Sequence, residues 1–142
     1  QRIPLQATMI DQRLSVRLAL AKQLVEAGEV DVDWWDEDLH QGRFETPQAL
    51  YDYLNMHRPV ENLHFCHGDL TFENILISDQ DGFRLIDVGR SGLADPYQDL
   101  ALLIRSARYR LEGIDLESME KALGITLDRF KLDYYLLLDE LF

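Results

Sequence analysis

The stretch that decides the fold is His67-Gly68-Asp69-Leu70-Thr71-Phe72-Glu73-Asn74, in which histidine, aspartate and asparagine have the spacing H-x-D-x-x-x-x-N. The apolar runs Ile75-Leu76-Ile77 and Phe83-Arg84-Leu85-Ile86 follow it and predict two strands, with a turn at the polar residues 79–82 between them. The second strand leads into Asp87-Val88-Gly89. Asp87 lies 13 positions after Asn74, which leaves room for one β-hairpin.

These polar residues match the roles that polar groups have in phosphoryl transfer from ATP. One carboxylate orients the attacking hydroxyl and accepts its proton, and an amide oxygen five residues further on can bind a magnesium ion. A second carboxylate on another segment holds that metal against the phosphates. Asp69 and Asn74 fit the first two roles, and Asp87 fits the third because Asp87-Val88-Gly89 is a variant of the D-F-G metal loop.

Each of these residues also has an ordinary structural explanation. Asp69 can cap a turn, Asp87 can be a strand-end carboxylate, and His67 can brace the loop. His64, Cys66 and His67 raise the alternative of a zinc site, but the two histidines would point to opposite faces of a strand and no second ligand pair follows. The joint spacing of the three polar residues favours phosphoryl transfer.

Helices are predicted on both sides of this small β centre. Apolar residues at helical spacing predict a first helix from Asp11 to Ala27, with Gly28 as its stop. Thr46-Pro47 predicts an N-cap and a first helical proline, opening a helix that stops before Pro59. Further elements are predicted as a strand at Leu63 to Cys66 and helices at Tyr97–Arg108, Leu116–Leu123 and Leu127–Leu141, the last with Thr126 as N-cap. This order predicts an α+β fold, without the alternation that builds a parallel sheet.

The composition is that of a globular, strongly acidic chain. Its 142 residues, 46% hydrophobic and 28% charged, are typical of one folded domain. Fourteen Lys and Arg against 26 Asp and Glu give a net charge of −12, which argues against nucleic acid or an anionic membrane as partner and favours cationic partners or metal ions. The only cysteine, Cys66, can form no internal disulfide, so we expect a reducing, cytoplasmic location.

Two further motifs are more selective than the loop. They are Ile86-Asp87-Val88-Gly89-Arg90-Ser91-Gly92-Leu93-Ala94-Asp95 with the following Tyr97-Gln98-Asp99-Leu100-Ala101, and the ending Tyr134-Tyr135-Leu136-Leu137-Leu138-Asp139-Glu140-Leu141-Phe142. Together with the loop they resemble the aminoglycoside 3′-phosphotransferases, antibiotic-resistance kinases whose fold is similar to that of protein kinases. The loop motif alone also occurs in choline, fructosamine and macrolide kinases. The resemblance runs over nearly the whole chain and implies the C-terminal, mainly helical lobe of a protein-kinase-like fold.

The resemblance also implies roles for individual residues. Asp69 would be the catalytic base, and Asn74 and Asp87 would bind Mg²⁺, with ATP as co-substrate. Asp99 would accept hydrogen bonds from the backbone of the catalytic loop, which His67 is expected to brace. Contacts to the cationic aminoglycoside are implied for Asp36, Glu37, Arg90, Arg105, Asp139, Glu140 and the terminal carboxylate of Phe142.

The acidic residues support such a substrate on physical grounds. Glu29 to Asp38 carries six carboxylates and no base, and the chain end adds more acids. An aminoglycoside carries several ammonium groups, so its site should be a cleft lined by carboxylates. The alternatives are that the acidic stretch is a solvated loop anchored by Trp34 and Trp35, and that Arg90 and Arg105 form ion pairs within the protein.

A kinase also needs a glycine-rich turn over the phosphates and a strand lysine paired with a helix glutamate. No three of the eight glycines make G-x-G-x-x-G, and Lys22, Lys121 and Lys131 all lie in predicted helices. We therefore expect that the nucleotide-binding N-terminal lobe is absent, that the chain is an excised piece or a truncated gene product, and that it is inactive alone. Ala7-Thr8-Met9 also stands where the family usually has Cys-Pro-Phe.

Two other functions stay open at this point. A lobe without its nucleotide-binding partner could act as a non-catalytic module that binds aminoglycosides or other cations. Within the enzymes, the alternative is a kinase for another small hydroxylated amine, such as choline or a macrolide sugar.

Overall fold

The computed structural model describes residues 10–79, 82–111 and 113–142. Its helices are α1 (Leu14–Ala27), α2 (Glu37–His40), α3 (Pro47–Met56), α4 (Tyr97–Arg110), α5 (Leu116–Leu123) and α6 (Arg129–Asp139). Its strands are β1 (Ile10–Asp11), β2 (His64–Cys66), β3 (Ile75–Ser78), β4 (Gly82–Leu85) and β5 (Gly92–Ala94), and 3-10 turns lie at η1 (Val32–Trp34), η2 (Phe72–Asn74) and η3 (Val88–Arg90). In these ranges no helix has both the length and the apolar character that crossing a bilayer requires.

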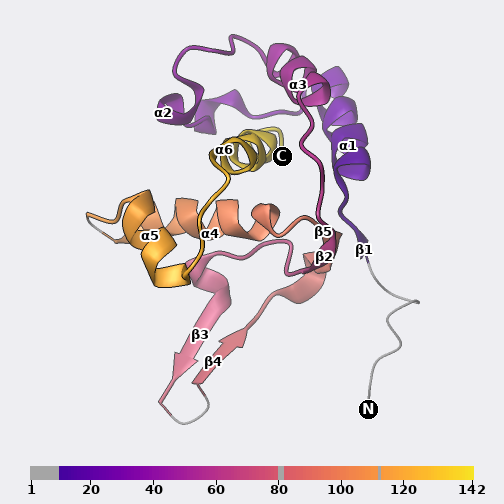
Figure 1. Ribbon diagram of the computed structural model, residues 1–142. Helices are drawn as coiled ribbons and strands as arrows, with labels where there is room; N and C mark the ends of the chain where they lie inside the picture. The colour runs from indigo at the N-terminus through magenta and orange to yellow at the C-terminus, as the bar shows by residue number, and fades with distance from the viewer. Residues whose placement is uncertain (1–9, 80–81, 112) are drawn as a thin grey trace.

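Helix α6 is the centre of the core. It packs against α4 on one side and against α2 and α3 on the other, and α3 packs in turn on α1 (Figure 1). Leu137, Leu138 and Leu141 are completely buried at this junction. The hydroxyl of Tyr134, also buried, donates a hydrogen bond to the carbonyl oxygen of Leu54 at 2.9 Å, which joins α6 to α3.

The strands form two small sheets. In the first, β5 is central, with β1 parallel on one side and β2 antiparallel on the other. Gly92 is required there because a Cβ atom at this position would lie 1.9 Å from the carbonyl oxygen of Ile10. The second sheet is the hairpin β3–β4, in which Ile75 pairs with Leu85 and which extends away from the helices (Figure 1).

Most of the predicted elements are confirmed, with one wrong cap. Thr46 caps α3 by accepting a hydrogen bond from the amide of Ala49 at 3.2 Å. Gly124 ends α5 in the left-handed conformation. The N-cap of α6 is Asp128, which accepts from the amide of Lys131 at 3.0 Å, and not Thr126 as predicted. Asp128 directly precedes Arg129, the first residue of α6, whereas Thr126 lies three residues before it.

Three features of the fold differ from the prediction. Asp11 belongs to β1 and not to the first helix, because residues 10 and 11 pair with β5 across the molecule. Strand β5 was not predicted at all, since three residues have too little periodicity to reveal a strand. The acidic stretch contains η1 and the single turn α2 and is not only loop. The altered family motif at residues 7–9 and the tip of the hairpin turn lie outside the described residues.

The packing predicts a contrast between two leucines of α1. Leu18 is 1% exposed and Leu20 is 47% exposed. Leu18→Ala should lower the free energy of unfolding by about 2–5 kcal/mol because it leaves a cavity in the core. Leu20→Ala should change it by no more than about 0.5 kcal/mol. Urea denaturation of both variants measures the difference, and equal losses would contradict the burial of Leu18.

Candidate active site

Asp99 fixes the backbone of the loop that carries Asp69. Its two carboxylate oxygens accept hydrogen bonds from the amides of His67, at 2.6 Å, and of Gly68, at 2.8 Å. Asp99 lies in the first turn of α4 and is buried, and a carboxylate is favoured at this end of a helix by the helix dipole. The backbone immediately before Asp69 is therefore held by two charge-assisted hydrogen bonds.

A close backbone contact brings the segment after Asp87 onto this loop. Gly68 has φ +87°, and a Cβ atom on it would lie 2.2 Å from the carbonyl oxygen of Arg90. The hydroxyl of Ser91 donates to the carbonyl oxygen of His67 at 3.1 Å. Only glycine combines this φ with this close approach, so the loop and η3 touch through their backbones.

His67 connects the same two segments through its ring. Nε2 lies 2.9 Å from the carbonyl oxygen of Ile86, which can only accept, so Nε2 carries the proton. Nδ1 then accepts from the amide of Asp69 at 3.3 Å. Because both ring nitrogens are used, His67 has the geometry of a brace between Asp69 and the residue before Asp87.

The zinc alternative finds no support in this geometry. His64 is exposed, whereas the ring nitrogens of His67 serve the loop. Burial raises the pKa of the Cys66 thiol to about 12, so it stays protonated and does not act as a thiolate ligand. Among the described residues no three His, Cys, Asp or Glu side chains are grouped so that they could hold a metal ion.

Asn74 and Asp87 stand at the open end of the hairpin. Asn74 precedes β3 and Asp87 follows β4 closely, and the amide of Ile86 donates to the carbonyl oxygen of Asn74 at 3.0 Å. The side-chain Nδ2 of Asn74 donates to the carbonyl oxygen of Asp69 at 2.7 Å. This orientation leaves the amide oxygen of Asn74 as an acceptor beside Asp69.

The backbone of Asp87 is strained. It adopts the left-handed conformation, with φ 55° and ψ 52°, which is uncommon for a residue other than glycine. Such strain persists only where the surrounding contacts hold it, and it is concentrated at functional sites. Here the hairpin on one side and the Gly68–Arg90 contact on the other hold the residue.

The second part of the site is a cavity of about 540 Å³ at the chain end. It is lined by Asp31, Trp34, Trp35, Asp36, Arg105, Tyr109, Asp139, Glu140 and Phe142. The structure thus brings together five of the seven residues for which the resemblance implies substrate contacts. Glu37, at the exposed start of α2, and Arg90, exposed in η3, do not line this cavity.

Glu140 ties the acidic stretch to the chain end. Its carboxylate accepts from the amide of Asp36 at 2.9 Å and from Arg105 at 3.2 Å, and its carbonyl oxygen accepts from the indole of Trp35 at 3.0 Å. Burial raises the pKa of Glu140, and the hydrogen bond from Asp36 and the charge of Arg105 act against that rise. Trp35 is therefore an anchor of the loop, whereas Trp34 is 84% exposed.

Arg105 is an ion-pair partner within the protein, one of the two roles left open for it. It pairs with Asp139 and with Glu140. Arg17 of α1 also approaches Asp139, at 3.8 Å, and its guanidinium lies 4.5 Å above the ring of Phe142. Sequence reasoning missed Arg17, although a base on the buried face of α1 next to Leu18 is an unusual position that could have indicated it.

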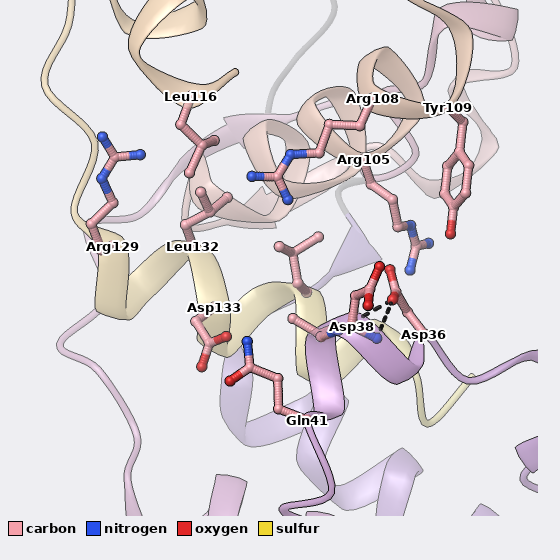
Figure 2. A pocket seen from close by; sticks show the side chains of 12 residues that line it. Asp36, Asp38, Gln41, Arg105, Arg108, Tyr109, Leu116, Arg129, Leu132 and Asp133 are labelled. Atoms are coloured by element: carbon pink, nitrogen blue, oxygen red, sulfur yellow. Dashed lines mark hydrogen bonds between the residues drawn. The ribbon is translucent and has the colours of Figure 1, made fainter. Parts of the chain in front are cut away.

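A second cavity of about 430 Å³ adjoins the first and lies between α2, α4, α5 and α6 (Figure 2). It is lined by Asp36, Asp38, Leu39, Gln41, Arg105, Arg108, Tyr109, Leu116, Arg129, Leu132, Asp133 and Leu136. Apart from Asp36 and Arg105, sequence reasoning named none of these residues as a site residue. They come from four elements and share no motif that a single sequence would reveal.

The fold and the site together define the class of protein. The profile of the phosphotransferase enzyme family matches residues 1–132, and the chain belongs to this family. Among curated relatives it is similar to the aminoglycoside 3′-phosphotransferase of Enterococcus faecalis, with 42% identity over 132 residues, which are 91% of this chain and 49% of that protein. The enzyme of the same name from Campylobacter jejuni is 32% identical over 145 residues, covering 100% of this chain and 56% of that protein. The chain thus spans about half the length of these relatives.

Solved structures agree with this assignment. An aminoglycoside-3′-phosphotransferase of type VIII superposes with a TM-score of 0.77 at 31% identity, covering 99% of this chain and 55% of that one. Aminoglycoside phosphotransferase APH(3″)-Id from Streptomyces rimosus, in complex with ADP and streptomycin, gives 0.78 at 30% identity and covers 98% and 56%. The resemblance to aminoglycoside phosphotransferases and the α+β, kinase-like fold are confirmed. A choline/ethanolamine kinase family protein, at 21% identity and a TM-score of 0.54, shares the fold alone.

The Gly68–Arg90 contact predicts a large effect of one methyl group. Gly68→Ala should lower the free energy of unfolding by about 3 kcal/mol more than Gly124→Ala does. Both positions have a positive φ, but only a Cβ atom at position 68 would clash with backbone atoms. Denaturant unfolding of the two variants checks this. A similar loss for both would mean that the loop and η3 are not in close contact.

Proposed function

We propose that the chain is the catalytic and substrate-binding part of an aminoglycoside kinase, which transfers a phosphoryl group from ATP to the 3′-hydroxyl of aminoglycosides and so confers resistance. The observation that carries the proposal is the loop held by Asp99, which gathers Asp69, Asn74 and the segment around Asp87 in one place. The cavity lined by acidic residues at the chain end supports a polycationic substrate.

Asp69 is proposed as the base that orients the substrate hydroxyl and accepts its proton. Its backbone is fixed on both sides, by Asp99 through Gly68 and by the side-chain amide of Asn74. Positioning of this kind removes the entropy cost of aligning a nucleophile with its base. His67 and Asp99 are proposed to act through this positioning and not by touching the substrate.

The residues present fit a magnesium ion. Mg²⁺ prefers oxygen ligands, one or two of them from the protein, with the others from phosphate and water. The amide oxygen of Asn74 and the carboxylate of Asp87 would supply such a pair at the end of one hairpin. When bound, the ion would neutralise charge on the phosphates.

The substrate contacts are proposed to come mainly from the acidic cavity. Asp36, Asp139 and Phe142 line it. Arg105 and Glu140 also line it and form an ion pair with each other. Glu37 and Arg90 are proposed to contact the substrate from outside this lining. Each ammonium group of the substrate would then find a carboxylate in a partly desolvated setting, where such pairs are less screened by salt.

ATP requires more than these 142 residues provide. The sequence holds neither a G-x-G-x-x-G turn nor a lysine outside the helices of the fold, so the groups that grip the nucleotide are proposed to come from a part equivalent to the other half of the relatives. The 142 residues alone are expected to transfer phosphate poorly or not at all. A cytoplasmic location is proposed because ATP is available there.

The first test is ligand binding by the chain itself. A ligand at 100 times its Kd stabilises the folded state by about 2.7 kcal/mol, which raises the Tm of a domain of this size by several degrees. Kanamycin should produce this rise at low salt, well beyond that of spermidine, and a neutral disaccharide should produce none. Differential scanning fluorimetry measures the three shifts.

The matched variants are Asp139→Asn and Asp52→Asn, which remove the same charge. Asp139 lines the cavity, whereas Asp52 lies exposed on α3 and accepts a hydrogen bond from Gln48. The kanamycin shift should fall with the first variant and persist with the second. Equal shifts for kanamycin and spermidine, or a shift insensitive to Asp139→Asn, would refute the substrate assignment.

The second test restores the rest of the enzyme. The chain is joined to the part of the Enterococcus faecalis relative that it does not span, and kanamycin phosphorylation is followed by ATP consumption. The chimaera should be active, and Asp69→Asn should lower its kcat by about 10²–10⁴ because the general base is lost. Asp52→Asn is the control and should leave kcat unchanged. An active chimaera with full kcat after Asp69→Asn would exclude Asp69 as the base.

A further inference from the structure

Arg17 of α1 lies behind the wall of the acidic cavity. Its side chain, 12% exposed, contacts Asp139 and Phe142, which both line the cavity, whereas Arg17 itself does not line it. Figure 1 shows the end of the chain between α6 and α1. A guanidinium keeps its charge when it is buried, and such a charge is tolerated only where partners surround it. The contacts of Arg17 therefore account for its position.

The first contact fixes one oxygen of the Asp139 carboxylate. Oδ1 of Asp139 lies 3.8 Å from Arg17, and Oδ2 pairs with Arg105 of α4. Each of the two oxygens thus has an arginine from a different helix as its partner. Without Arg17 the carboxylate would keep its pair with Arg105, but the side facing α1 would lose its partner.

The second contact fixes the ring of Phe142. The guanidinium of Arg17 lies 4.5 Å from the centroid of this ring, a favourable distance between a cation and an aromatic face. The amide of Phe142 donates to the carbonyl oxygen of Asp139 at 3.2 Å, so the ring and the carboxylate belong to one turn. The ring is 48% exposed. Arg17 therefore holds two cavity-lining groups of this turn at once.

We propose that Arg17 is a positioning residue for substrate binding, which holds the Asp139 carboxylate and the Phe142 ring where they meet the aminoglycoside. This inference rests on the proposed function. A ligand of defined shape binds more tightly to groups that are already in place, because less ordering entropy is lost on binding.

Arg17 has two effects of opposite sign on a polycationic substrate. Its positive charge repels the ammonium groups, whereas its contacts place the groups that receive them. Removing Arg17 makes the cavity more negative and at the same time frees Asp139 and Phe142 to move. The positioning effect is the larger of the two, so the loss of Arg17 should weaken the binding of an aminoglycoside in spite of the added negative charge.

The test follows kanamycin binding to the 142-residue chain by isothermal titration calorimetry. Arg17→Met removes the guanidinium and keeps an apolar side chain. The affinity for kanamycin should fall about tenfold, a change of the size expected for one buried contact between a cation and an aromatic ring. Spermidine has no fixed shape, so its affinity should not fall. If the charge of Arg17 were all that mattered, the affinity for kanamycin would rise.

Two variants serve as controls. Lys22→Met removes one positive charge from the same helix at an exposed position, where Lys22 pairs with Glu26 at 3.6 Å and lines neither cavity. This variant should not weaken kanamycin binding. Arg17→Lys keeps the charge but lacks the flat guanidinium, so its affinity should lie about threefold below that of the unaltered chain. If Arg17→Met does not fold, Arg17→Lys decides, and an undiminished affinity of this variant overturns the proposal.

A double-mutant cycle shows whether Arg17 acts through Phe142. In a chain that carries Phe142→Leu, the further change Arg17→Met should lower the affinity for kanamycin less than about threefold, because the ring that Arg17 holds is already gone. An equal loss with and without the ring, or an affinity that Arg17→Met leaves unchanged or raises, overturns the positioning role, and the proposed function stands. If kanamycin does not bind saturably to the unaltered chain, both fail.

Discussion

The carboxylate of Asp99 is the constraint on which the site depends. It accepts hydrogen bonds from the amides of His67 and Gly68 at a buried position at the start of α4. These bonds tie the loop that carries Asp69 to this helix. Two adjacent buried amides would otherwise lack partners, and each would cost about 1–3 kcal/mol. The helical core thus helps to set the loop conformation, together with Gly68 and the side chains of His67 and Asn74.

Helix α4 connects the loop that carries Asp69 with the acidic cavity at the chain end. Asp99 at its first turn holds the loop with Asp69, Arg105 further along pairs with Asp139 and Glu140, and Arg108 reaches into the second cavity. Because α4 packs on α6, which ends in those acids, the loop that carries Asp69 and the acidic cavity share one support. Such sharing suits a reaction in which base and substrate must be aligned closely.

Glu140 adds a negative charge to the acidic cavity and also holds two segments of the chain together. The family resemblance implies that it contacts substrate, and the structure adds that it joins the acidic stretch to the chain end through Asp36 and Arg105. Acidic residues would repel one another in an unpaired cluster. Here arginines from α1 and α4 hold Asp139 and Glu140 in place, while the carboxylate of Asp36 caps α2 by accepting from the amides of Asp38 and Leu39.

The sequence by itself determined the long helices, the Thr46 cap, the hairpin, and the loop motif with Asp69, Asn74 and Asp87, because each of these depends on neighbours within a few residues. Its motifs also sufficed for the family. Only the tertiary structure decided that Ile10 and Asp11 form a strand on β5, that Arg17 reaches Asp139, and that Arg108 of α4 and leucines of α2, α5 and α6 line a second cavity. These features join residues that are far apart in the chain, and a local sequence pattern does not predict which distant residue a side chain will contact.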